Sequence, residues 1–215
     1  MLILMLAAGL TAAPTPSPVP ANPCNPAESC RYIDEFPVKD AQGQSHTVQV
    51  KRWLPYLLNG RLTLFPGEVV SVSVSDKGPA VTAATVLTAE DRDSGTEALA
   101  AQVQKETLQN GKEQLKAVPR ASANQTFLAE KDSLRLAFLQ TGQGDMMLRI
   151  ASGYGGMLTY KAGIVRPGAK GPSPTSVCSV VALKTGIETW PPPIVAIELS
   201  DFKVEASEAV QPVCR

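Results

Sequence analysis

A single histidine limits the catalytic chemistry open to this chain. His46 is the only histidine among 215 residues, and it lies in the polar stretch AQGQSHT, where we expect a solvated turn. A blue-copper site requires two imidazoles and a thiolate, and histidine-rich zinc catalysis requires several imidazoles. A Ser-His-Asp triad would have to use His46, and the sequence has no nucleophile-elbow motif. We therefore expect no catalytic residue, no metal site and no cofactor.

Carboxylates offer a second chemistry, because a pair of them in a cleft can cleave glycosides. The densest cluster, EDRD at residues 90–93, lies in polar sequence, and we interpret it as a solvated acidic turn. Glu198 and Asp201 flank a predicted β-bulge near Ser200, and bulges can re-aim side chains next to sites. Outward-facing carboxylates are ordinary on strands, so a carboxylate-dependent hydrolase is our second alternative function.

Two further motifs have structural interpretations. The glycines of SGYGG, at residues 152–156, lack the strand-to-helix context of a phosphate-binding loop. We expect a hairpin connection that uses the positive φ open to glycine. Met146, Met147 and Met157 carry the soft sulfur ligands of a copper(I) site, but we expect them to pack in the core.

The cysteines indicate an oxidising compartment. Cys24, Cys30, Cys178 and Cys214 are an even number, as expected for two disulfides in an exported chain. Of the three possible pairings we favour Cys24–Cys30 with Cys178–Cys214, because each pair lies within one end of the chain. A four-cysteine zinc site is disfavoured, because neither pair has C-x-x-C spacing.

The N-terminal residues predict a signal peptide over residues 1–21. LILMLAAGL is an apolar run of nine residues, whereas a membrane helix needs about 20. Cleavage after Ala21 is favoured over cleavage after Ala13, because Pro14 would follow Ala13 directly. We therefore expect an exported protein, periplasmic or secreted, with no membrane span after cleavage. Lys+Arg and Asp+Glu both number 20, and this balance argues against a nucleic-acid partner.

The remaining sequence predicts short β-strands. Residues 22–36 are expected to be a disulfide-stapled entry loop, because their prolines prevent a helix. Alternating apolar patterns then occur in SHTVQVKRW, RLTLFPGEVVSVSVS, AVTAATVL, SLRLAFLQ, DMMLRIASGYGGMLTYKAGIV, VCSVVAL and IVAIELSDF. We expect residues 22–215 to form a single domain, an immunoglobulin-like antiparallel β-sandwich of about eight strands. A helical or partly disordered insertion is expected near residues 90–118, with one amphipathic helix over 95–109.

The stretch ETWPPPIVAIELSDF predicts a rigid entry into a strand. Three prolines fix φ and force an extended approach, so the ring of Trp190 is held on a stiff arm and can close one end of the core. Recognition of the prolines by an aromatic-lined groove is the alternative. This stretch, together with TSVCSVV and LRIASGYGGMLTYKAGI, resembles uncharacterised secreted proteins of Gram-negative bacteria. No activity and no site residue follow from that resemblance.

We therefore expect a non-catalytic module of the bacterial periplasm or cell envelope that binds another envelope protein, of unknown identity. An exposed apolar patch or an open, uncharged edge strand would favour this function. The alternative is a small-molecule or carbohydrate-binding module, in which Trp53, Tyr56 and Tyr154 would have to converge on a concave pocket.

Overall fold

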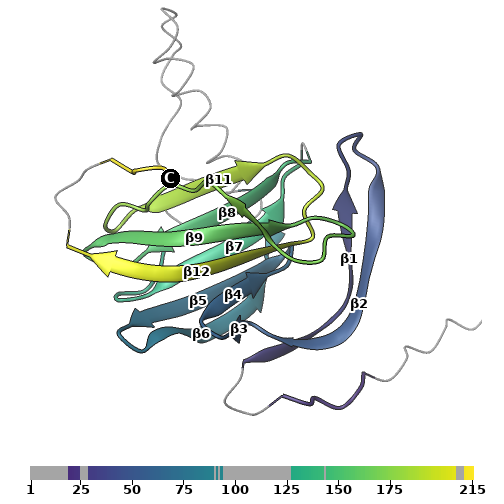
Figure 1. Cartoon of the computed structure of the whole chain (residues 1–215), viewed down its shortest axis with the longest axis horizontal. Coiled ribbons are helices and arrows are strands. Elements are labelled where there is room, and N and C mark those ends of the chain that lie inside the picture. Colours follow the sequence, from purple (N-terminus) through teal and green to yellow (C-terminus); the bar gives the residue numbers. More distant parts are fainter. Residues whose placement is uncertain are drawn as a thin grey trace, which may run out of the picture.

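The structure, a computed structural model, describes residues 19–24, 29–89, 91, 93, 127–142, 144–206 and 211–215. These residues form twelve strands in three antiparallel sheets (Figure 1). The strands are β1 Cys30–Lys39, β2 Ser45–Pro55, β3 Leu57–Leu58, β4 Arg61–Leu64, β5 Glu68–Ser75, β6 Gly78–Val86, β7 Leu134–Gln140, β8 Met146–Ser152, β9 Met157–Val165, β10 Ser173–Thr175, β11 Thr185–Trp190 and β12 Ala196–Glu205.

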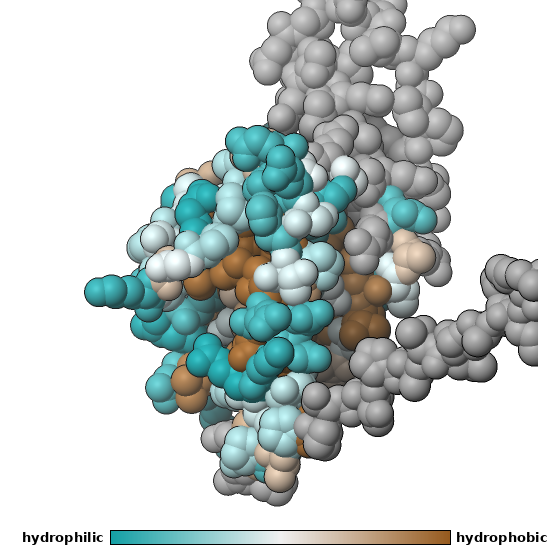
Figure 2. All heavy atoms as spheres, turned by 90° about the vertical axis from the view of Figure 1, so that its right-hand side faces the viewer, coloured by the Kyte–Doolittle hydropathy of each residue, from teal (hydrophilic) through white to brown (hydrophobic). Residues whose placement is uncertain are grey.

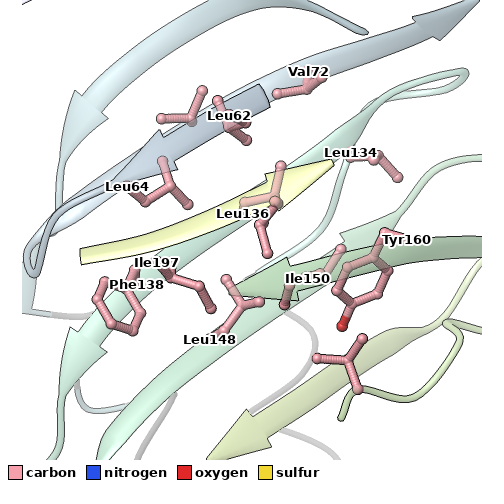
Figure 3. Close-up of a cluster of buried hydrophobic side chains, with 14 of the residues drawn as sticks. Leu62, Leu64, Val72, Leu134, Leu136, Phe138, Leu148, Ile150, Tyr160 and Ile197 are labelled. Atoms are coloured by element: carbon pink, nitrogen blue, oxygen red, sulfur yellow. The ribbon is translucent and has the colours of Figure 1, made fainter. Parts of the chain in front are cut away.

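Two five-stranded sheets enclose the main core. Their strand orders are β10-β9-β12-β4-β3 and β11-β8-β7-β5-β6. Alternate residues of each strand point inward, because successive side chains of a strand lie on opposite faces. The buried set includes Leu62, Leu64, Val72, Leu134, Leu136, Phe138, Leu148, Ile150, Tyr160 and Ile197 (Figure 3). The expectation of a mainly β, sandwich-like protein is confirmed.

The third sheet is the β1–β2 hairpin, which packs along one side of the sandwich (Figure 1). Phe36 and Val38 of β1 are buried, and the ring of Phe36 meets that of Phe65 edge-on at 5.5 Å between centroids. Near the tip, the Lys39 N–H donates to Gln140 Oε1 at 2.7 Å, and Gln140 Nε2 donates to the Lys39 carbonyl at 2.9 Å. These contacts fix the hairpin to the sandwich near its tip.

The prediction that SGYGG is a hairpin connection is wrong. The motif joins β8 in one sheet to β9 in the other, so it is a crossing between sheets and not a hairpin connection. None of its three glycines has a positive φ. Close approach of the backbone explains them instead. A Cβ on Gly153 would overlap the Glu130 carbonyl oxygen, and one on Gly156 would lie 2.6 Å from the Glu205 carbonyl oxygen.

The proline run also crosses between the sheets. β11 ends at Trp190 in one sheet, and β12 begins at Ala196 in the other. Trp190 is 8% exposed within the core, and its Nε1 donates to Thr175 Oγ1 at 2.9 Å. The Pro192–Pro193 peptide bond is cis. The expected packing of the tryptophan ring on the core is confirmed, and the stiffness of the strand entry stays a prediction.

Other sequence-based boundaries were wrong. The expected entry loop at 22–36 is replaced from Cys30 onward by β1, which tolerates Pro37 because it pairs with β2 only. VCSVVAL forms isolated bridges, Leu158 to Val180 and Cys178 to Cys214, and the following strand is β11. The expected helix over 95–109 lies outside the described residues, as does the 90–118 insertion apart from residues 91 and 93.

Both disulfides are those favoured from the sequence, Cys24–Cys30 and Cys178–Cys214. They fit an oxidising environment. Within the described part of the chain, no helix has the length and apolar character needed to cross a bilayer.

Candidate functional site

The strand β6 is an open edge without charge. It has nine residues, GPAVTAATV, and among the described strands it pairs with β5 only. In an antiparallel ladder every second residue turns its N–H and C=O away from its partner strand, so within the described part of the chain β6 presents backbone groups without a strand partner along its other side. The side chains of residues 82–86 are exposed, and Val86 is 79% exposed. β6 lies beside β5 at the lower side of the view in Figure 1.

Only the first half of β6 carries the features that normally protect an edge. Pro79 lacks an N–H, and the pairing with β5 shifts by one residue at Thr82, between Val81 and Ala83. Charged side chains, prolines and bulges all discourage pairing with another chain. Residues 83–86 have none of these features and remain in register with β5. This second half of β6 is therefore the part that can accept an added strand.

The other edges of the described sheets are less suitable. β3 has two residues, β10 has three, and β11 has six and carries Glu188. The strands of the hairpin carry several charges, among them Glu35, Lys51 and Arg52. Short length and charge are both features that protect edges from pairing. β6 is thus the best candidate for β-strand addition among the strands described.

A groove of about 730 Å³ lies on the outer face of β9 and β12. Its walls come from β10, from the segment that follows it, and from the C-terminal residues Val213 and Arg215. Val213 is held by a hydrogen bond of 2.9 Å from its N–H to Ser179 Oγ. The lining mixes apolar side chains with charged ones, including Lys161, Asp201, Lys203, Glu205 and Arg215.

The predicted bulge at Ser200 and Asp201 is confirmed, because the β12–β9 register shifts there and Asp201 has φ 53°. The two carboxylates beside the bulge form separate ion pairs. Glu198 forms an ion pair with Arg61 at 2.9 Å, and Asp201 forms one with Lys161 at 2.7 Å. The hydrogen bond from Lys161 holds the pKa of Asp201 below its ordinary value. A general acid needs a raised pKa, so Asp201 is unsuited to that role.

Among the described carboxylates, Glu188 is the one whose pKa is raised, because its half-buried position penalises the charged form. It accepts a hydrogen bond of 2.6 Å from the Cys178 N–H, which couples β11 to the segment beside the groove. Its neighbourhood includes the phenol of Tyr160, whose pKa is raised mainly by burial and further by the charge of Glu188.

Glu188→Gln should flatten the pH dependence of stability. A raised pKa means that the folded state holds the proton more tightly than the unfolded state, so wild-type stability falls as pH rises from 4.5 through the folded pKa. Glutamine keeps an acceptor for the Cys178 N–H and carries no charge. Urea unfolding at several pH values should show that the variant loses less stability above pH 4.5, while the two proteins converge at lower pH. Equal losses would contradict this assignment.

The three aromatic residues expected at a carbohydrate pocket have separate environments. Tyr56 is buried beneath the guanidinium of Arg31, whose Cζ lies 3.9 Å from the ring centroid. The Tyr154 hydroxyl accepts a hydrogen bond of 2.7 Å from the Val74 N–H. Trp53 pairs with Tyr32 on the hairpin. None of the three lines the groove, so the groove does not supply the convergence that this alternative requires.

The remaining candidate ligands are also dispersed. His46 is exposed and bonds Asp40 at 2.6 Å. Met146 packs in the main core, while Met147 lies in the second apolar cluster, on the opposite face of the sheet. In the residues described, no group of three or more His, Cys, Asp or Glu side chains could hold a metal ion. The expected exposure of His46 is confirmed, although it lies in β2 and not in a turn. Met146 and Met147 pack in the two apolar clusters as expected, whereas Met157 is buried at the groove.

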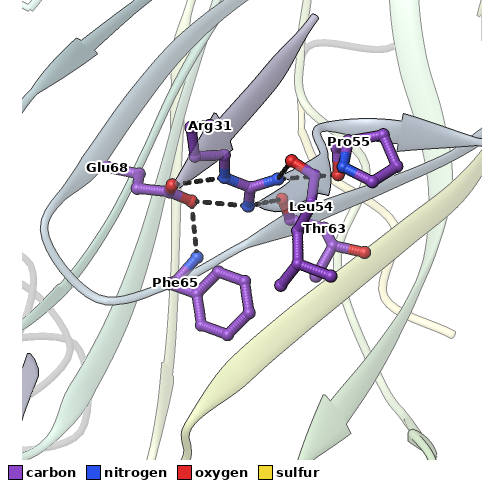
Figure 4. Close-up of polar contacts among 6 residues, drawn as sticks. All are labelled: Arg31, Leu54, Pro55, Thr63, Phe65 and Glu68. Carbon is purple, nitrogen blue, oxygen red and sulfur yellow. Dashed lines mark hydrogen bonds and ion pairs between the residues drawn. The ribbon is translucent and has the colours of Figure 1, made fainter. Parts of the chain in front are cut away.

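Arg31 anchors the hairpin at its base, and sequence analysis missed it (Figure 4). Its Nε and Nη2 donate to the two carboxylate oxygens of Glu68 at 2.7 and 3.0 Å. Its other N–H groups reach the carbonyls of Leu54 at 3.3 Å, Pro55 at 2.7 Å and Thr63 at 2.8 Å. These bonds join β1, the end of β2, β4 and β5 through one guanidinium.

A second group of charges lies on the outer face of the β11-β8-β7-β5-β6 sheet. The guanidinium groups of Arg135 and Arg149 lie 4.6 and 4.4 Å from the ring centroid of Phe127. Asp91 bonds Arg135 at 3.0 Å and is only 8% exposed, so the expectation of a solvated acidic turn is wrong at Asp91. Burial lowers the pKa of Arg149 to about 10, which leaves it charged at neutral pH. We interpret this cluster as structural.

Comparison with protein-family models, with curated proteins and with solved structures found no match.

Proposed function

We propose that this chain is a non-catalytic, exported module of the bacterial periplasm or cell envelope, and that it binds an extended segment of another protein as an added strand on β6. The carrying observation is the exposed second half of β6, which has no charge, no proline and no bulge. Main-chain hydrogen bonds along such an edge give affinity, and alternate side chains give specificity.

Other features support this proposal. The two disulfides and the apolar N-terminal run fit export. Glu198 and Asp201 are each paired with a cation, which fits a surface without hydrolase chemistry. We include an immunoglobulin-like architecture in this proposal, because a sandwich of that kind displays edge strands to partners.

The test combines site-specific cross-linking with one charge variant. A photo-reactive amino acid at Thr85 should cross-link one partner in the envelope of the host cell, whereas the same group at Lys203, on the other sheet, should not. Ala84→Lys should reduce this cross-linking about tenfold or more, because a charge on an edge strand opposes pairing. Ala84→Thr is the matched control and should retain it, because threonine favours strands.

Circular dichroism should show that both Ala84 variants remain folded, since Ala84 is exposed. Recovery of the bait alone, or equal cross-linking from Thr85 and Lys203, would contradict strand addition at β6.

The groove on β9 and β12 favours a second candidate function, the binding of a small polar molecule. Its volume of about 730 Å³ lies within the range typical of ligand pockets. A thermal-shift screen of charged metabolites and oligosaccharides tests it. A ligand of the groove should raise the melting temperature of the wild-type protein but not that of Lys203→Glu, which reverses a charge in the lining.

A further inference from the structure

Tyr32 and Trp53 form an aromatic pair on the hairpin. They lie directly opposite each other in the β1–β2 ladder, with ring centroids 5.8 Å apart and planes tilted by 59°. Both are half-buried, so part of each ring is accessible. The face of the molecule that carries the hairpin shows hydrophilic and hydrophobic side chains next to each other (Figure 2).

The indole of Trp53 contacts the chain's own N-terminal segment. Its Nε1 donates a hydrogen bond of 2.8 Å to the carbonyl oxygen of Pro20, which is 33 positions away in the sequence. The disulfide between Cys24 and Cys30 keeps this segment close to the start of β1. Cys30 lies opposite Pro55, two positions along the ladder from the aromatic pair.

The sequence of this segment matches the chemistry of the aromatic pair. Residues 14–23 read PTPSPVPANP, with proline at every second position from 14 to 20. Such a sequence favours the extended polyproline II conformation, whose carbonyls are not bonded within the segment and remain free to accept hydrogen bonds. Aromatic rings and an indole N–H are the groups that bind polyproline II segments in known recognition modes.

We propose that Tyr32 and Trp53 form a docking site for an extended proline-rich segment, and that Val19–Pro23 of this chain occupies it in cis. The short covalent connection from Pro23 to Cys30 raises the effective concentration of the segment at the site, so a modest intrinsic affinity is sufficient. Cleavage after Ala21, which the sequence favours, removes Pro20 and vacates the site.

The test uses the full chain with both disulfides and the peptide PTPSPVPANP. The chain has two tryptophans, so its nitrogen-15 NMR spectrum contains two indole N–H signals. The signal of Trp190, which is buried and bonded to Thr175, serves as an internal reference. In a Pro18→Gly/Pro20→Gly variant, which weakens the segment in cis, the peptide should shift the Trp53 signal only. Wild type should need about tenfold more peptide, because its own segment competes.

Two controls separate recognition from chance packing. A peptide with all five prolines of residues 14–23 replaced by alanine should not shift the Trp53 signal. Adding Tyr32→Ala to the glycine variant should weaken peptide binding several-fold, while the Trp190 signal reports that the core is intact. No shift at millimolar peptide, or equal binding of the alanine peptide, would overturn the docking site. A Trp53 signal that depends on protein concentration would overturn the assignment in cis.

Discussion

Arg31→Met is expected to lower the free energy of unfolding by about 3–5 kcal/mol, because it removes one partner of a buried ion pair. The side chains of Arg31 and Glu68 are only 11% and 10% exposed. Methionine preserves much of the volume over Tyr56 and Phe65, the two rings beneath the guanidinium. The loss therefore comes from the Glu68 carboxylate and from the carbonyls of Leu54, Pro55 and Thr63, which lose their donor. Urea unfolding with both disulfides intact measures it.

Arg61→Met is the matched control. Arg61 also pairs with a glutamate, Glu198, but its side chain is 59% exposed, and exposed pairs contribute about 0–1 kcal/mol. Adding Glu68→Gln to Arg31→Met should recover part of the loss, because the amide oxygen still accepts from the Phe65 N–H without a buried charge. Equal losses for Arg31→Met and Arg61→Met would show that Arg31 does not anchor the hairpin.

Strands could be predicted from the sequence where apolar residues alternate. The connections between strands were predicted wrongly where contacts between distant residues determine them. β5, β7, β9 and β12 have clear alternation or apolar runs and were expected. The sequence did not indicate to which sheet each strand belongs. Hairpins and crossings between sheets both use short glycine-rich or proline-rich segments, so SGYGG was assigned to a hairpin. A local pattern does not report which strands pair over long distances.

The buried charges were missed for a related reason. Arg31 and Asp91 lie in polar sequence, and their ion pairs join them to residues far away in the sequence, Glu68 for one and Arg135 for the other. Arg149 did leave a signal, because it interrupts the apolar run MMLRIA of β8, every residue of which is buried. A single charge within such a run indicates a partner elsewhere in the fold, since burying a charge is costly unless it is compensated.

The uncharged composition of the candidate site on β6 could be predicted from the sequence, but its position at the edge of a sheet could not. The absence of charge from AVTAATVL is visible in the sequence, and the stretch was expected to be a strand. Under the proposed function, its suitability for strand addition comes from its place at the end of the β11-β8-β7-β5-β6 sheet. A central strand with the same residues would have no free backbone groups.

Gly153→Ala should destabilise the protein by about 3 kcal/mol or more, at the upper end of the range for overpacking. The new Cβ would overlap the carbonyl oxygen of Glu130, which is backbone and cannot rotate away. The turn that carries this carbonyl is also bonded to Gly153 itself. The Gly153 N–H donates to the Ser133 carbonyl at 2.8 Å, and the Asp132 N–H donates to the Gly153 carbonyl at 3.2 Å. Moving the turn aside therefore breaks hydrogen bonds at the crossing between the sheets.

Gly155→Ala is the control for this substitution, because it lies two positions further along the same crossing. A Cβ there meets nothing within 4 Å, and Gly155 is exposed with no positive φ. Its effect should be close to zero or slightly stabilising, since alanine restricts the unfolded chain. Urea unfolding of the two variants compares them directly. Similar losses at both positions would mean that the crossing needs flexible glycines, whereas a loss at Gly153 alone identifies close backbone packing as the reason for glycine there.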